Sequence, residues 1–158
     1  MPRHAATTTD ATLSAAEIDI LLFNIEEEKL AGDVYEALAD LYDLKIFDRI
    51  AASEDRHLDA LLNQAERLGV DVSALPEEEG VFANAELQAL YDDLIVWGST
   101  SLTAALEVGI SIETMDLTSL AESIELTSDA TLDAVYASLL AGSESHLAAF
   151  TSTLDLFG

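Results

Sequence analysis

The sequence predicts an all-α protein, namely a four-helix bundle with one long crossover and extra short helices. Three observations favour this fold. The prolines, Pro2 and Pro76, leave long stretches without a helix breaker. Apolar residues in these stretches recur every three or four positions, and the alternation typical of strands is hard to find. Capping signals divide the chain into four long segments in two pairs, as expected for a bundle with a crossover between the pairs.

The first pair of helices has clear boundaries. Ser14 and Glu17 have the spacing of a capping box, in which each side chain binds a free amide of the other residue. We therefore expect the first helix to begin there and to run to about Tyr42. The second helix follows from about Lys45 and stops at Gly69, a residue type that commonly ends helices.

The stretch VDVSALPEEEGVFAN comes next and contains both Pro and Gly, so it is the best candidate for the crossover. Asn84 is expected to cap a shorter helix that ends at Gly98. Either Ser99 or Ser101 then opens the third long helix, which is expected to run to about Asp116.

The C-terminal part is predicted to hold two further elements. Thr118 or Ser119 starts a short helical piece, because a second capping-box spacing begins at Ser119. Ser128 caps the last long helix, which runs nearly to the end. Residues 1–13 are predicted to be a disordered tail, and residues 14–158 a single domain.

The charge balance excludes some classes of partner. The chain has 31 acidic and six basic residues, for a net charge of −25. Such a charge opposes binding to nucleic acid and to anionic membranes. It also indicates an extreme halophile, in which salt screens the self-repulsion. The chain has no cysteine, which excludes zinc–thiolate sites and cysteine nucleophiles. It has neither a signal-peptide pattern nor an apolar run of about 18 residues, so we expect a cytoplasmic location.

Each long helix carries an apolar stripe that acids or histidines interrupt at one level. Burying a carboxylate costs several kcal/mol or more unless it is paired or binds a metal. The stripes contain no Lys or Arg, so we expect a cation to supply the positive charge. Oxygen and imidazole ligands without sulfur suit iron or manganese, although zinc also accepts them. On these stripes the candidate ligands are Glu27, Glu54, His57, Glu113, Asp116 and His146, and Glu28 lies beside the stripe of the first helix as a further candidate.

Four segments in order resemble a known superfamily: EEEKLAGDVYEAL, IFDRIAASEDRHLDAL, ALEVGISIETMDL and LLAGSESHLAAF. They are similar to the ferritin-like di-iron carboxylate proteins, whose bundles use one Glu on each of two helices and Glu-x-x-His on the other two. The similarity is closer still to a small uncharacterised prokaryotic ferritin-like domain family, as a haloarchaeal-type member. It covers about residues 15–155. The resemblance implies a ferritin-like bundle that holds two iron ions, with one ion or manganese as alternatives.

Two ligand positions stay open. The expected Glu-x-x-His of the last helix reads Ser143-x-x-His146, so a carboxylate is missing there. Asp116 or Glu144 is the candidate to replace it. On the first helix, periodicity favours Glu27, whereas the Tyr that follows the ligand by seven residues in better-known relatives favours Glu28.

The resemblance implies reaction with dioxygen or peroxide, as in a ferroxidase or a peroxidase. A peroxidase of the rubrerythrin type would need an external electron donor, since cysteine is absent. The alternatives are a metal-free or single-metal bundle with a structural or interaction role, and an iron-storage subunit. The partners considered are metal ions, that electron donor and a second copy in a homodimer.

Overall fold

A computed structural model describes residues 13–157, which form five helices and no strand. This confirms the predicted all-α bundle. The predicted disordered tail lies outside the described residues except for Leu13, which is buried. Within the described range, no helix is both long enough and apolar enough to cross a membrane. The helices are α1 (Ala15–Leu41), α2 (Lys45–Leu68), α3 (Ala85–Gly98), α4 (Leu102–Leu126) and α5 (Ala130–Phe157).

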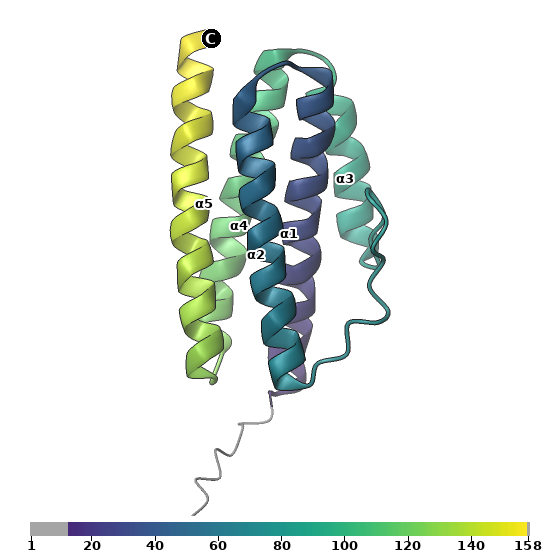
Figure 1. The fold of residues 1–158 in the computed structure, drawn as a ribbon, viewed down its shortest axis with the longest axis vertical. Coiled ribbons are helices and arrows are strands. Elements are labelled where there is room, and N and C mark those ends of the chain that lie inside the picture. The colour runs from purple at the N-terminus through teal and green to yellow at the C-terminus, as the bar shows by residue number, and fades with distance from the viewer. Residues whose placement is uncertain (1–12, 158) are drawn as a thin grey trace, which may run out of the picture.

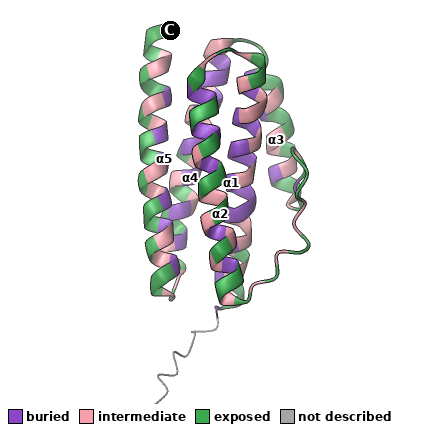
Figure 2. Ribbon diagram, viewed as in Figure 1, coloured by how far each residue is buried: buried purple, intermediate pink, exposed green. Residues whose placement is uncertain are grey.

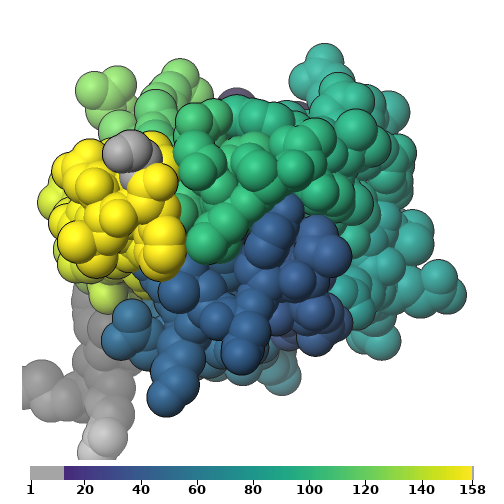
Figure 3. Space-filling model, turned by 90° about the horizontal axis from the view of Figure 1, so that it is seen from above, coloured from purple at the N-terminus to yellow at the C-terminus, as the bar shows by residue number. Residues whose placement is uncertain are grey.

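The four long helices form a four-sided bundle (Figure 1). The most extensive packing is of α1 on α2 and of α4 on α5, and the two pairs meet through α1 with α4 and α2 with α5. The crossover after α2 runs along the outside and leads into α3, which packs on α1 and α4. Viewed from above, α5 and α3 lie on opposite sides of the molecule (Figure 3). Every long helix therefore presents one face to a shared interior.

Four of the predicted helix boundaries are confirmed by the hydrogen bonds at the caps. Ser14 and Glu17 form the complete capping box at the start of α1. Gly69 ends α2 in the left-handed conformation, with φ of 69°, which a residue without Cβ adopts readily. The Asn84 side chain accepts from two backbone amides of α3, and of the two serines proposed for the start of α4 it is Ser101 that caps it.

The predicted break near Asp116 is wrong, since α4 continues without interruption to Leu126. The sequence there has no Gly or Pro to end the helix. The hydroxyl groups that suggested a new cap have other partners. Thr118 donates to the carbonyl of Thr114 one turn earlier, and Ser119 donates to Glu27 on α1.

The predicted cap of the last helix is also wrong by one residue. Asp129 accepts the Leu132 amide at 2.8 Å and so caps α5. Both the amide and the hydroxyl of Ser128 donate instead to Glu17 at the start of α1, at 2.5 and 2.7 Å. The contact joins the beginnings of two helices that are far apart in sequence.

The buried residues line the interior of the bundle (Figure 2) and form two apolar clusters. One contains Leu30, Val34, Leu38, Phe47, Leu106, Ile112 and Phe150, among others. The second contains Leu21, Ile25, Leu61, Leu120, Leu132, Tyr136 and Leu139, among others. Along each of the four long helices, the polar residues of the candidate site lie between the positions that feed these clusters, so the site is enclosed by apolar packing on both sides.

Candidate metal centre

The seven predicted ligands lie on all four long helices. Six of them are buried, and the exception is His57, whose side chain is 14% exposed. They come from α1 (Glu27, Glu28), α2 (Glu54, His57), α4 (Glu113, Asp116) and α5 (His146). The helices are held at this level by the apolar clusters, so the side chains converge without any contribution from a loop.

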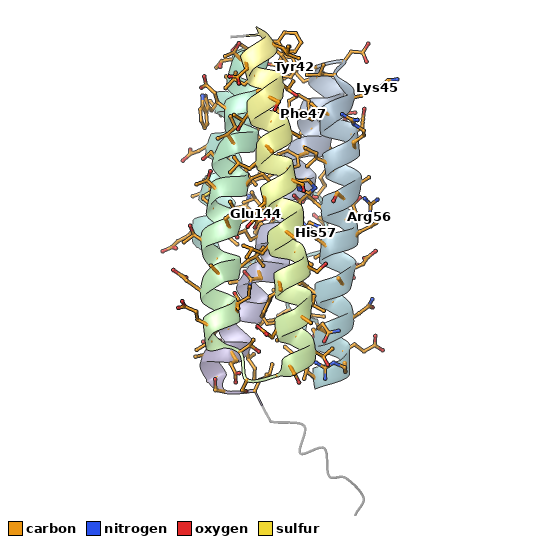
Figure 4. All side chains as sticks on the ribbon, turned by 90° about the vertical axis from the view of Figure 1, so that its left-hand side faces the viewer. Tyr42, Lys45, Phe47, Arg56, His57 and Glu144 are labelled. Atoms are coloured by element: carbon orange, nitrogen blue, oxygen red, sulfur yellow. The ribbon has the colours of Figure 1, made fainter. Side chains whose placement is uncertain are left out.

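The first group of donors consists of Glu28, Glu54 and His57. His57 Nδ1 lies 3.1 Å from Glu54 Oε2 and 3.4 Å from Glu28 Oε2. In Figure 4 the neighbouring Arg56 projects from the outer edge of α2, whereas His57 lies on the side that faces α5. The spacing of three residues between Glu54 and His57 places both on one face of α2.

The second group consists of Glu54, Glu113 and His146. His146 Nδ1 lies 3.0 Å from Glu54 Oε1 and 3.4 Å from Glu113 Oε1. The two imidazoles are stacked, with centroids 5.5 Å apart. In each group the donor atoms all lie within 4.8 Å of one another. Glu54 therefore belongs to both groups, with one oxygen turned toward each histidine.

The buried acids elsewhere in the described residues have a donor for each oxygen, whereas most acids of the centre have at least one oxygen without a donor. Glu26, also buried, accepts the amides of Ala83 and Asn84 with its two oxygens. By contrast, neither oxygen of Glu28 has a hydrogen-bond partner among residues 13–157, and one oxygen each of Glu27, Glu113 and Asp116 is in the same position. Buried polar atoms in folded proteins are nearly always satisfied. These oxygens are thus oriented toward something other than a protein donor.

No Lys or Arg of the described residues forms an ion pair with these carboxylates. Loss of water around the buried groups raises the pKa of Glu28, Glu54 and Asp116 well above the usual values, and the neighbouring carboxylates add to the effect. Burial also raises the pKa of Glu27 to about 9. A divalent cation would lower these pKa values, because it stabilises the ionised form of each carboxyl group.

The structure brings Glu28, not Glu27, into the first donor group, although periodicity favoured Glu27. The buried face of α1 is wide because this helix packs on both α2 and α4. Glu28 faces α2 and approaches His57, whereas Glu27 faces α4 and accepts from Ser119 at 3.1 Å. A single stripe of apolar residues does not describe a helix that packs on more than one neighbour.

Of the two candidates to replace the missing carboxylate, Asp116 lies in the interior and Glu144 does not. Asp116 is 1% exposed, and its Oδ2 accepts from the hydroxyl of Ser143 at 3.2 Å. Glu144 is exposed on α5. Asp116 nevertheless does not belong to either donor group; it lies beside them, on the side of Glu27.

Two residues that position the ligands were not identified as such from the sequence. The hydroxyl of Tyr35 donates to Glu113 Oε1 at 2.9 Å. His146 Nε2 lies 2.9 Å from Ser53 Oγ, which leaves Nδ1 for the carboxylates. Partners of this kind orient metal-binding histidines. The spacing of Tyr35 from Glu28 was a signal for the first, but Ser53 contacts a residue 93 positions away and gave no local signal.

Residues 17–158 match the family model described as Uncharacterized protein domain (DUF2202). Uncharacterized protein MJ0754 of Methanocaldococcus jannaschii is 36% identical over 146 residues, which cover 92% of this chain and 79% of that protein. A crystal structure of hypothetical protein MJ0754 from Methanococcus jannaschii DSM 2661 matches with a TM-score of 0.89, and the match covers 92% of this chain and 83% of that one. These names state no activity and no ligand.

Proposed function

The chain belongs to the family of uncharacterized domains DUF2202, and since that name carries no activity, we propose from the geometry that the protein binds two metal ions in a ferritin-like bundle. Glu54 belongs to both donor groups and would help to hold both ions. Glu28 and His57 would complete one site, and Glu113 and His146 the other.

The observation that carries this proposal is the placement of Glu54 between two histidines. Its Oε2 lies 3.1 Å from His57 and its Oε1 lies 3.0 Å from His146. A carboxylate that served as the partner of one histidine would not need both oxygens in this arrangement. The unpartnered oxygens of Glu28 and Glu113 supply further acceptors at the same level.

The donor set fits iron first and manganese second. It consists of carboxylate oxygens and imidazole nitrogens, and the chain has no cysteine to favour softer metals. The positions of the donors also support the ferritin-like assignment, since such bundles take a Glu from two helices and Glu-x-x-His from the other two. Here α1 and α4 supply Glu28 and Glu113, α2 supplies the complete motif, and α5 supplies its histidine.

When bound, a pair of iron or manganese ions supplies redox chemistry toward dioxygen or peroxide. The chain's own residues bind and orient the ions. Tyr35 holds Glu113 in place, Ser53 contacts Nε2 of His146 and so orients its ring, and the two apolar clusters limit access of water. Turnover as a peroxidase would require an external electron donor, which we propose as a partner.

One observation favours a second candidate, a bundle that binds a single ion. The last helix offers Ser143 where a carboxylate would complete the second donor group, and that serine donates to Asp116. The ion at Glu28, Glu54 and His57 would then be the one that is retained. A structural role for the bundle would follow in that case.

Metal content tests the proposal. Chelator-treated protein would be loaded with Fe²⁺ without oxygen, or with Mn²⁺, and bound metal measured per chain. We expect two ions for the unmodified protein and for Glu144→Gln, which changes an exposed carboxylate on α5. Glu54→Ala combined with His57→Ala should lose both ions, since it removes the carboxylate that both donor groups share and one histidine.

Near-stoichiometric metal in this double variant would refute the proposed site. One ion in the unmodified protein would favour the single-ion candidate. Circular dichroism of each variant establishes that a loss of metal does not reflect a loss of the fold.

The setting is also part of the proposal. A net charge of −25 supports the proposal that the source organism is salt-adapted. It also supports the proposal that the protein does not bind nucleic acid or anionic membranes. We place it in the cytoplasm, where reduced iron or manganese is accessible.

A further inference from the structure

A surface hollow of about 330 Å³ lies between α1 and α4. Its lining consists of threonine and serine side chains, two large apolar side chains and one acid, Glu27. We call it the α1–α4 hollow; its residues are Phe23, Glu27, Thr114, Met115, Thr118 and Ser119. The hollow is open to solvent, and Glu27 forms its connection to the interior because that side chain is only 4% exposed.

Glu27 is buried without a full set of partners. Its Oε2 accepts from Ser119 at 3.1 Å, but its Oε1 has no hydrogen-bond partner within residues 13–157. The buried carboxyl group of Asp116 on α4 is close enough to oppose the ionisation of Glu27. Two neighbouring buried acids below an open hollow are stabilised either by protons or by a cation.

Asp116 continues the path inward. Its Oδ2 accepts from Ser143, and its Oδ1 is a second buried oxygen without a partner in the described part of the chain. Asp116 follows Glu113 by three residues on α4, so the two lie on one face of the helix. Oxygen atoms thus lead from the hollow, through Glu27 and Asp116, to the second donor group.

We propose that divalent cations reach the dinuclear centre through the α1–α4 hollow and are held in transit by Glu27 and Asp116. This inference rests on the proposed function. The transit site formed by Glu27 and Asp116 contains two carboxylates and two serine hydroxyls but no imidazole, so it suits a hard, partly hydrated cation. It should bind more weakly than the centre, where histidines add to the carboxylates. A cation is thereby attracted from solvent and passed on.

Two measurements distinguish a residue of the transit site from a ligand of the centre: the rate at which the cation binds, and the number of cations bound at saturation. Co²⁺ serves as a redox-stable probe, and its visible absorbance follows arrival at the centre in a stopped-flow instrument. We expect Glu27→Gln to bind as many ions at saturation as the unmodified protein but to load at least about tenfold more slowly, as for the loss of a focusing charge. Asp116→Asn should behave likewise. Glu144→Gln, which removes the same charge outside the hollow, should load at the normal rate.

Each other result has a distinct meaning. Equal loading rates for Glu27→Gln and Glu144→Gln would overturn the route while leaving the dinuclear centre intact. A lower capacity in Glu27→Gln would also overturn it, since Glu27 would then be a ligand of the centre. Absence of Co²⁺ binding to the unmodified protein would refute the proposed function itself, and the route with it.

Discussion

At the level of single residues, the feature that requires explanation is the presence of five carboxyl groups at one level of an apolar interior. Glu26 and Glu17 show that this protein can bury an acid by giving it backbone amides. The acids of the centre receive fewer donors, and their pKa values rise as a result of burial. Without a cation, protons must therefore stabilise the site.

This proton binding predicts how the metal-free protein responds to pH. The unfolded chain holds Glu27 near its ordinary pKa of 4.5, whereas the folded protein raises that pKa to about 9. Between these values only the folded state keeps the proton. A rise in pH through this window therefore lowers the free energy of unfolding, by up to about 1.4 kcal/mol per pH unit for each such carboxyl.

Urea denaturation in the presence of a chelator measures this effect. We expect a lower free energy of unfolding at about pH 8.5 than at about pH 6, with a shallower dependence in Glu27→Gln because one of the titrating groups is gone. Equal or greater stability at the higher pH would contradict the account of the buried acids.

The sequence was informative about single residues wherever the chemistry was local. Glu54 and His57 lie three residues apart on one helix, so their proximity follows from helix geometry alone. The contact of Ser53 with His146 and that of Ser119 with Glu27 join different helices. They depend on the rotation of each helix about its axis, and spacing within one helix does not determine that rotation.

Two glycines within helices allow close approach at the level of the centre. A Cβ added to Gly142 on α5 would lie 2.7 Å from His57 Nε2. A Cβ added to Gly109 on α4 would lie 2.7 Å from the Phe150 ring. Both contacts are too close, but the two obstructed side chains differ in their freedom to move.

For Gly142→Ala we expect weaker cation binding in a folded protein. The His57 side chain is partly exposed and can turn outward, away from Glu28 and Glu54. The substitution also favours the helix by about 1 kcal/mol. Titration with Mn²⁺ should show a loss of affinity of about tenfold or more at one site, as for displaced metal ligands, with unchanged or increased stability in urea.

Gly109→Ala provides the contrast. Phe150 is fully buried and packs on Tyr35 and Phe47, with ring centroids 5.1 and 6.0 Å away, so it cannot yield easily. Here the expected loss is in stability, of about 1–3 kcal/mol, as for other overpacked cores. The role assigned to Gly142 would be wrong if Gly142→Ala, and not Gly109→Ala, lost stability. Normal Mn²⁺ binding by folded Gly142→Ala would also contradict it.

At the level of helices, the sequence predicted the boundaries that a cap or a glycine marks. Ser14, Gly69 and Asn84 act in the structure as predicted. The predicted break near Asp116 failed because a serine or threonine inside a helix resembles a cap in sequence. Its hydroxyl has other uses, and Ser119 donates to a neighbouring helix.

At the level of the whole molecule, the charge of −25 governs the response to salt. Ionic strength screens the repulsion between surface carboxylates, and the Debye length grows from about 3 Å at 1 M to about 10 Å at 0.1 M. We therefore predict that the urea midpoint falls when KCl is lowered from about 2 M to about 0.05 M. A midpoint that does not depend on salt would show that the surface charges are not coupled to folding.

The architecture of the molecule was predictable because the helices are long and few breakers interrupt them. Their arrangement into two pairs followed from one long polar connection between two shorter ones. The position of α3 against α1 and α4 was not predictable. It depends on Glu26, which accepts the amides of Ala83 and Asn84 just before α3, more than 50 residues away in sequence.

We propose that Glu54 helps to hold both cations, and anomalous diffraction from crystals grown with Mn²⁺ tests this most directly. The account predicts two peaks inside the bundle, one beside Glu28 and His57 and one beside Glu113 and His146, with a Glu54 oxygen bound to each. A bundle interior without anomalous peaks, or peaks that are not in contact with Glu54, would contradict it.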